Sequence, residues 1–219
     1  MKHKMEVDSV LLEFGQQRIL LDVYVKCETG SITGLFGRNG QGKTCLMNVI
    51  YGSLQATSKS VRFDDVSTYE AYKRSDILTY LPQSRFIPLS LTLKRIFLDF
   101  EVSFSEFEDF FPEFKLLSNS VIGKLSGGQR RLVEVYVIMK SNAQFSMLDE
   151  PFTHIMPVHI EKMKDIMMLE KLKKGFLITD HLYRQTIDIC DTVYVLNNCK
   201  VYLTKQLEDI EKFGYVRIN

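Results

Sequence analysis

A glycine-rich octapeptide has the residue types and the spacing that phosphate binding requires. Glycine lets backbone N–H groups approach a triphosphate closely, and the start of a following helix adds partial positive charge. Lys43 can reach the β- and γ-phosphates, and Thr44 can place its hydroxyl on Mg²⁺. The sequence therefore predicts a phosphate-binding loop made of Gly37, Arg38, Asn39, Gly40, Gln41, Gly42, Lys43 and Thr44.

The segments on either side of this loop support the prediction. Residues 31–36 form an apolar run that stops at Gly37, and residues 43–51 suit a helix. Strand, loop and helix in this order are the context that a phosphate loop needs. A glycine-rich turn without a ligand is the alternative, and these flanks disfavour it.

Two adjacent carboxylates end another apolar run. Residues 144–148 predict a buried strand, and Asp149 and Glu150 follow it directly. Adjacent residues at a strand end point to different sides, so the two carboxylates can take two different roles. Alone, the pair would suit a solvated surface turn. In a chain with a phosphate loop it indicates an active site.

A second glycine-bearing segment precedes a predicted helix at residues 129–140. Ser126 offers a hydroxyl group, and the two glycines after it offer unhindered backbone amides at the helix start, where anions bind. A flexible linker is the alternative, but the amphipathic pattern that begins at once disfavours it. We expect a second anion site at Ser126, Gly127, Gly128 and Gln129.

The order and spacing of these three segments resemble the ATP-binding cassette family, the nucleotide-hydrolysing subunits of ABC transporters. The pentapeptide Leu125–Gln129 is the defining motif of that family. In relatives it grips the γ-phosphate that the other protomer holds, so one site needs two chains in a head-to-tail, two-fold arrangement. The resemblance implies ATP and Mg²⁺ as cofactors and a second cassette subunit, in a homodimer, as partner.

The resemblance also implies a role for each polar residue near the phosphates. Asp149 would hold Mg²⁺ mostly through water, with Thr44 and Gln83 as further metal contacts. Glu150 would polarise the attacking water. The implied catalytic residues are Lys43, Gln83, Glu150 and His181, the last as the histidine that contacts the γ-phosphate.

Two further positions complete the implied nucleotide site. Phe14 resembles the aromatic residue that stacks on adenine, which needs only a π face. A core aromatic on an N-terminal strand is the alternative. Cys45 stands where relatives usually carry a hydroxyl residue, and its thiol is a weaker hydrogen-bond donor toward the α-phosphate.

The sequence departs from the family pattern at two places. Met156 occupies the position of an aspartate that helps to couple the two sites of the dimer, so cooperativity and turnover are in doubt while ATP binding is not. Cys199 stands where relatives commonly have a glycine in a hairpin turn. We expect Asn197 and Asn198 to form that turn and to carry its strain, because Asn tolerates positive φ.

Alternating strand and helix patterns predict one α/β domain over residues 1–219, with a P-loop NTPase core of ABC-ATPase type. An N-terminal antiparallel β part and a small helical subdomain at about residues 84–140 would complete it. The remaining predicted elements are a hairpin at 7–14 and 19–26, strands at 61–63, 77–81 and 176–179, a helix at 160–174, and a second hairpin at 193–196 and 201–203.

Composition limits the classes of partner. Apolar residues make up 45% of the 219 residues, charged residues 25%, and the net charge is +1, so no nucleic acid is expected as the main partner. The cysteines match no zinc pattern. No apolar run reaches the roughly 18 residues that cross a bilayer, and the N-terminus lacks a secretion signal. We expect a cytoplasmic chain, peripheral on the inner face of the membrane.

The sequence thus predicts an ATP-hydrolysing subunit that powers movement of a substrate through a separate integral membrane permease. The permease would dock in a groove near Gln83 and the helical insert. Two alternatives stay open. One is a soluble ABC ATPase without a transport role, and the other is an ATP-dependent switch module that hydrolyses weakly, which Met156 motivates.

Overall fold

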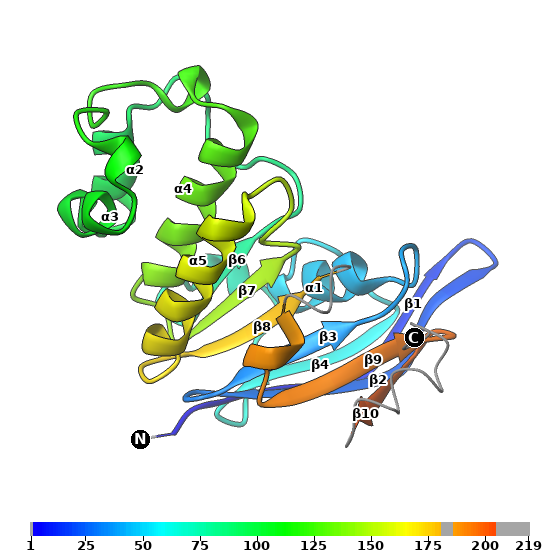
Figure 1. Ribbon diagram of the computed structural model, residues 1–219. Helices are drawn as coiled ribbons and strands as arrows, with labels where there is room; N and C mark the ends of the chain where they lie inside the picture. Colours follow the sequence, from blue (N-terminus) through cyan, green and yellow to red (C-terminus); the bar gives the residue numbers. More distant parts are fainter. Residues whose placement is uncertain (1, 181–185, 205–219) are drawn as a thin grey trace, which may run out of the picture.

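The computed structural model describes residues 2–180 and 186–204, and six of its strands form a mainly parallel sheet in the order β10-β9-β3-β8-β7-β6 (Figure 1). Only β10 runs antiparallel to its neighbour. Every residue of β3, β7 and β8 is buried, which is typical of a parallel sheet covered on both faces. The strands are β3 (Ile32–Phe36), β6 (Leu78–Leu81), β7 (Phe145–Asp149), β8 (Gly175–Thr179), β9 (Thr192–Asn197) and β10 (Lys200–Thr204).

A second, antiparallel sheet has the strand order β2-β1-β4-β5. Alternating buried and exposed residues in β1 match a sheet with one face toward a core. The predicted N-terminal hairpin is confirmed, with the turn at Gly15 and Gln16. The strands are β1 (Lys4–Phe14), β2 (Gln17–Glu28), β4 (Ser58–Phe63) and β5 (Val66–Ser67).

Two hydrophobic cores lie on opposite faces of the parallel sheet. On one face, helix α1 (Lys43–Tyr51) and the antiparallel sheet pack against residues such as Met147 and Leu177. On the other face, helices α4 (Gly127–Lys140) and α5 (Pro157–Glu170) pack against residues such as Leu148 and Ile178. The predicted α/β core is therefore confirmed, with the parallel sheet as its central layer.

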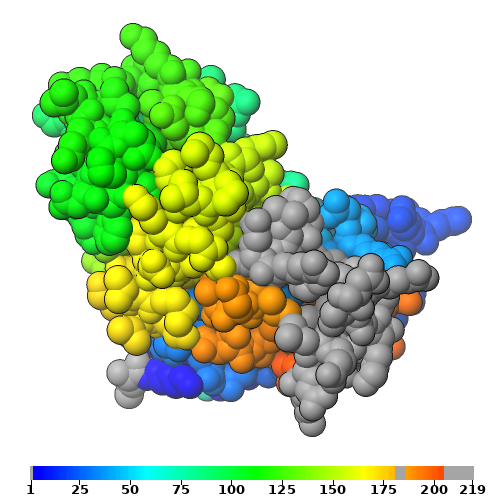
Figure 2. All heavy atoms as spheres, viewed as in Figure 1, coloured from blue at the N-terminus to red at the C-terminus, as the bar shows by residue number. Residues whose placement is uncertain are grey.

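Within the region predicted as a small helical subdomain, about residues 84–140, residues 84–124 form an insert that gathers at one end of the molecule (green in Figure 2). It contains α2 (Leu93–Asp99), α3 (Phe104–Phe110) and short 3₁₀ turns at Pro112–Phe114 and Ile122–Lys124. Further 3₁₀ turns lie at Ala71–Lys73 and Ile187–Ile189. The insert has a fully buried aromatic core to which α4 contributes Tyr136, whose ring centroid lies 4.8 Å from that of Phe107. Helix α4 therefore joins the insert to the parallel sheet.

Within the described residues, no helix is both long enough and apolar enough to cross a membrane.

The prediction for the C-terminal hairpin turn is wrong by one residue. Asn197 still belongs to β9 and pairs with Lys200, so the turn consists of Asn198 and Cys199. Their φ angles are 48° and 64°. Positive φ at both central positions is the conformation of a type I′ turn, one of the two common two-residue hairpin loops. The strain therefore falls on Asn198 and Cys199, and not on Asn197.

The predicted helix at residues 160–174 is wrong at both ends. Helix α5 begins at Pro157, whose fixed φ suits the first helical position, and it ends at Glu170. The backbone N–H groups of Lys173 and Lys174 both donate to the carbonyl oxygen of Glu170, which turns the chain toward β8. This turn points the side chain of Lys174 into the interior, where Lys174 is 3% exposed.

Lys174 explains why a serine interrupts the apolar strand β7. Its ammonium donates to the carbonyl oxygen of Ser141 at the end of α4, and lies 3.4 Å from the hydroxyl oxygen of Ser146. Burial penalises the charged form and lowers the pKa of Lys174 from 10.5 to about 8. Ser146 therefore serves as a polar partner for a buried lysine.

We predict that Lys174 makes stability rise between pH 8 and pH 10.5. Below pH 8 the lysine is charged in both the folded and unfolded states, so the burial penalty is fully present. As pH rises toward 10.5, the folded state has already lost its proton while the unfolded state still holds one, so the penalty is relieved. Relative to Lys174→Met, the wild-type free energy of unfolding should gain about 2 kcal/mol between pH 7.5 and pH 10. Chemical denaturation at several pH values measures this, and parallel profiles would contradict it.

We also predict that Cys199→Gly stabilises the protein relative to Cys199→Ala. Both substitutions remove the contact of the thiol with the carbonyl oxygen of Arg18, but only glycine relieves the positive φ of 64°. Left-handed backbone costs a non-glycine residue about 1 kcal/mol. The free energy of unfolding of the glycine variant should exceed that of the alanine variant by about this amount. Equal stabilities would show that the turn is unstrained.

Candidate functional site

The predicted phosphate loop lies between the carboxyl end of β3 and the start of α1, as its context requires. Gly42 precedes the helix with φ 105°, a conformation that side-chain-bearing residues rarely adopt. Gln41 accepts a hydrogen bond from the backbone of Asn198 at 3.1 Å, which ties the loop to the β9–β10 turn. The loop is thus held from β3, from α1 and from the C-terminal hairpin.

Lys43 lies folded onto its own loop. Its ammonium donates to the carbonyl oxygens of Gly37 at 2.6 Å and Arg38 at 3.2 Å, and the residue is 6% exposed. Burial lowers the pKa of Lys43, while the negative charges of Glu150 and Asp149 act in the opposite direction. A cation held by two neutral carbonyl groups in a low-dielectric site is well placed to bind an anion instead.

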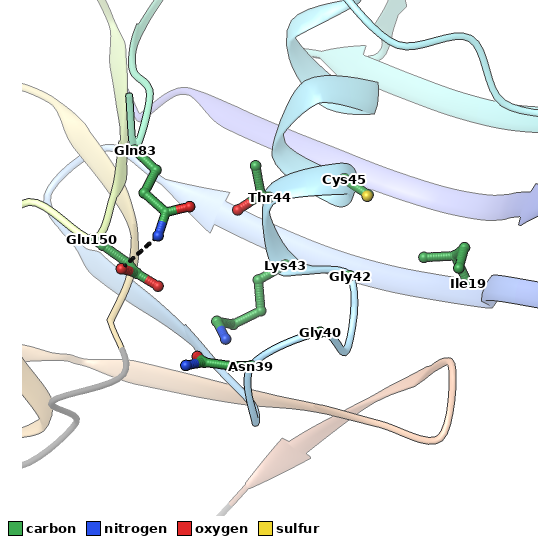
Figure 3. Close-up of a pocket in the computed structure, with 9 residues that line it drawn as sticks. All are labelled: Ile19, Asn39, Gly40, Gly42, Lys43, Thr44, Cys45, Gln83 and Glu150. Atoms are coloured by element: carbon green, nitrogen blue, oxygen red, sulfur yellow. Dashed lines mark hydrogen bonds between the residues drawn. The ribbon is translucent and has the colours of Figure 1, made fainter. Parts of the chain in front are cut away.

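A pocket of about 420 Å³ lies between the phosphate loop and the residues that follow β6 and β7 (Figure 3). Gln83 and Glu150 face the loop across the pocket, and the dashed line in Figure 3 marks the hydrogen bond between them. Eight of the nine lining residues were predicted for the site, and Ile19 was not. The lining consists of Ile19, Asn39, Gly40, Gly42, Lys43, Thr44, Cys45, Gln83 and Glu150.

Asp149 is the last residue of β7 and is fully buried. One carboxylate oxygen accepts a hydrogen bond from the hydroxyl of Thr179 at 2.5 Å. The other lies 3.4 Å from the hydroxyl of Tyr80. These contacts hold the Asp149 carboxylate behind the pocket wall, where it lies close enough to Lys43 to influence the lysine's pKa.

Glu150 has an unusual backbone for a residue with a side chain, with φ 48°. Its backbone N–H donates to the carbonyl oxygen of Thr179 at 3.0 Å. Its carboxylate accepts a hydrogen bond of 2.9 Å from the side-chain amide of Gln83. The strained backbone turns the Glu150 side chain into the pocket while the neighbouring Asp149 stays behind it, so the two carboxylates occupy different environments.

The donor set around the pocket suits Mg²⁺ with phosphate and water as further ligands. Thr44 and Gln83 line the pocket and offer a hydroxyl and an amide oxygen, and the carboxylate of Asp149 lies behind the pocket wall; Mg²⁺ prefers oxygen ligands of these kinds. Among residues 2–180 and 186–204, no cluster of three or more His, Cys, Asp or Glu side chains could enclose a metal by itself. A partial protein shell of this kind is typical of Mg²⁺ bound together with a substrate's phosphates.

The predicted second anion site lies apart from this pocket, at the exposed start of α4 (Figure 1). Ser126 and Gln129 form a capping box, in which each side chain bonds the backbone N–H of the other at 3.2 and 3.0 Å. Gly128 is needed for a close approach, because a Cβ there would lie 2.5 Å from the carbonyl oxygen of His154. The segment thus presents its first residues to the outside, and its own chain's pocket does not use them.

Three other predicted positions stand as follows. Phe14 ends β1, is 51% exposed and does not line the pocket. His181 lies outside the described residues. Met156 is 59% exposed directly before α5. Stacking by Phe14 and the role of His181 therefore stay predictions.

Sequence reasoning missed four residues around the site. Ile19 reaches the pocket from β2, and its position was noted only as part of a strand. Thr179 is the last residue of β8, and Tyr80 is the last but one of β6; both strands pair with β7. Their places near the strand ends were the available signal. Arg131 donates hydrogen bonds to the backbone carbonyl oxygens of Asp149 and Glu150. The available signal was its charge at a position in the buried part of a helix.

Comparisons with known proteins agree with this geometry. A sequence model of the ABC transporter family matches residues 20–153. The lipopolysaccharide export system ATP-binding protein LptB of Haemophilus influenzae is 27% identical, covering 93% of this chain and 90% of that protein. The LptB protein of Escherichia coli K12 is 31% identical, covering 83% and 81%.

A solved ATP-binding subunit of an ABC transporter matches the fold with a TM-score of 0.80 at 24% identity, covering 96% of this chain and 93% of that one. A nucleotide-free ATP-binding cassette from an ABC transporter matches with a TM-score of 0.78 at 22% identity, covering 97% and 95%. The chain belongs to the ABC transporter family.

Proposed function

We propose that this chain is the ATP-binding and ATP-hydrolysing subunit of an ABC transporter. The observation that carries the proposal is the pocket in which Lys43 and Thr44 of the phosphate loop face Gln83 and Glu150. The pocket contains residues with the chemistry to bind a triphosphate, to neutralise its negative charge and to activate a water molecule.

The proposed reaction converts ATP and water to ADP and phosphate. Lys43 leaves the carbonyl groups of its loop and, with the loop amides, neutralises the phosphates. Thr44, Gln83 and Asp149 would hold Mg²⁺, which would supply charge screening at the phosphate oxygens. Glu150 orients the attacking water and accepts its proton, and Gln83 keeps the Glu150 carboxylate aimed at that water.

The proposed site is completed by a second copy of the chain. Residues 126–129 start a helix, are exposed at their first positions and lie apart from their own pocket. In a head-to-tail homodimer, they would contact the γ-phosphate held by the partner's loop, with His181 contacting it from the same chain as Lys43. Closure on ATP and opening after hydrolysis would then move the groove near Gln83.

The energy of this cycle would be used by a separate integral membrane permease docked at that groove. The LptB relatives are named as ATP-binding proteins of a lipopolysaccharide export system, and this chain covers most of their length. Their names support the role of a separate ATP-binding subunit in an export system. We expect this subunit to be cytoplasmic and peripheral on the inner face of the membrane. The permease would select the transported molecule.

A weakly hydrolysing ATP switch is a second candidate, because Met156 stands exposed in the loop that follows Glu150. A methionine there cannot make the charged contacts across the dimer that an aspartate makes. A steady-state ATPase assay separates the two candidates, since a switch would turn over far more slowly than it binds and releases ATP.

We predict that Glu150→Gln traps an ATP-bound dimer. The amide keeps the shape of the side chain but cannot accept a proton, so turnover should fall at least a hundredfold while ATP binding persists. Size-exclusion chromatography with ATP and Mg²⁺ should show a stable dimer for this variant. Glu161→Gln, at an exposed position on α5, is the matched control and should hydrolyse ATP like the wild type. Unchanged turnover in Glu150→Gln would refute the role of Glu150.

We predict that Phe14→Ala weakens ATP binding about fivefold, while Phe14→Tyr leaves it unchanged. Loss of one aromatic stacking contact corresponds to about 1 kcal/mol. Inorganic tripolyphosphate has no base to stack, so its affinity should be equal in all three proteins. Competition binding measures both ligands. Equal ATP affinities in the alanine and tyrosine variants would place adenine elsewhere in the pocket.

A further inference from the structure

Arg131 lies in the second turn of α4 and points its guanidinium group into the seam between the helix and the sheet edge. It donates to the carbonyl oxygen of Pro82 at 2.8 Å, to that of Asp149 at 2.8 Å and to that of Glu150 at 3.1 Å. The residue is only 7% exposed. One planar group thus bonds two loops that follow different strands.

The three carbonyl groups belong to the backbone that carries the proposed catalytic pair. The Pro82 carbonyl is part of the peptide bond to Gln83, and the other two belong to the last residue of β7 and the residue after it. The side chains of Gln83 and Glu150 meet on the pocket side of the same loops, at 2.9 Å. Arg131 therefore supports the Gln83–Glu150 pair from behind.

Glu150 needs such support because its φ of 48° is strained. A left-handed conformation is unfavourable for a residue with a Cβ and persists only where the surroundings hold it. The N–H of Glu150 is held by Thr179, and its carbonyl oxygen is held by Arg131. Helix α4 and strand β8 together fix the backbone on both sides of the Glu150 Cα atom.

Burial of the charged Arg131 side chain costs desolvation free energy, which indicates that this side chain is not buried for hydrophobic packing. Desolvation lowers the pKa of Arg131, while Glu134, at 3.6 Å, and the negative charges of Asp149 and Glu150 act in the opposite direction. A cavity of about 400 Å³ adjoins the guanidinium and is lined in part by Arg85, Arg130 and His154. Because open space lies beside it, hydrogen bonds rather than close packing hold the two loops against α4 at this point.

We infer that Arg131 is a positioning residue that ties the Gln83–Glu150 pair to the helix whose first residues bind the partner's nucleotide. Helix α4 begins at Gly127, directly after Ser126, so a shift of its start displaces the guanidinium and with it the backbone of Pro82 and Glu150. Contact of the Ser126 segment with a γ-phosphate in one site is thereby transmitted to the carboxylate of the other site. This inference rests on the proposed function of Glu150.

The test uses Arg131→Lys in the full chain, with Arg130→Lys as the matched control. Lysine keeps the positive charge beside Glu134, but one ammonium on a flexible stem cannot span three carbonyl groups. We expect the kcat for ATP to fall tenfold to a hundredfold, with the affinity for ADP in the absence of Mg²⁺ changed less than twofold. Arg130 makes one long bond, of 3.4 Å, to the Gly123 carbonyl, so Arg130→Lys should retain wild-type values.

Two further readouts separate positioning from a general loss of stability. In a double-mutant cycle with Gln83→Ala, the two losses in kcat should not multiply, because both act through the Glu150 carboxylate. Hydrogen–deuterium exchange of the nucleotide-free protein should increase in peptides covering residues 82–86 and 148–153, and not in peptides covering β1 or β2.

Wild-type kcat in Arg131→Lys, fully multiplicative losses, or exchange that increases throughout the chain would each overturn the inference. Failure of the proposed function has a different signature. It would leave the wild type without ATPase activity, or Glu150→Gln as active as the wild type, while the local exchange difference at residues 148–153 would still report on the Arg131 contacts.

Discussion

The carboxyl edge of the parallel sheet determines where the functional residues of this protein lie. The phosphate loop follows β3, Gln83 lies two residues beyond β6, and Asp149 and Glu150 lie at the end of β7. Because these strands run in the same direction, their ends meet at one edge, and residues far apart in sequence share one pocket there. Hydrogen bonds within the sheet thus bring the site together before any ligand is present.

Helix α4 connects this edge to the rest of the molecule. Its start carries the serine–glycine segment, its second turn carries Arg131, and its later turns pack into both the aromatic insert and the sheet. A rigid helix transmits a displacement at one end to the other. The separation of the pocket from the predicted second anion site, and their proposed communication, therefore depend on the same element.

The sequence allowed the site residues of the loops to be predicted because their motifs are local. Lys43 was identified from the glycine-rich loop, Glu150 from its place after an apolar run, and Gln83 from the family resemblance; the structure brings all three around one pocket. Arg131 and Thr179 were missed because their contacts join segments 18 to 49 residues apart, and the sequence does not show which segments meet. The hairpin turn was misplaced at Asn197 because asparagine content was weighed above strand register, which places Asn198 and Cys199 at the turn.

The most direct measurement of the central claim is a crystal or cryo-EM structure of the Glu150→Gln variant with ATP and Mg²⁺. The account predicts two chains in head-to-tail arrangement, with each γ-phosphate between Lys43 of one chain and Ser126 of the other. ATP bound by a single chain, with Ser126 facing solvent and no second chain against the nucleotide, would contradict it.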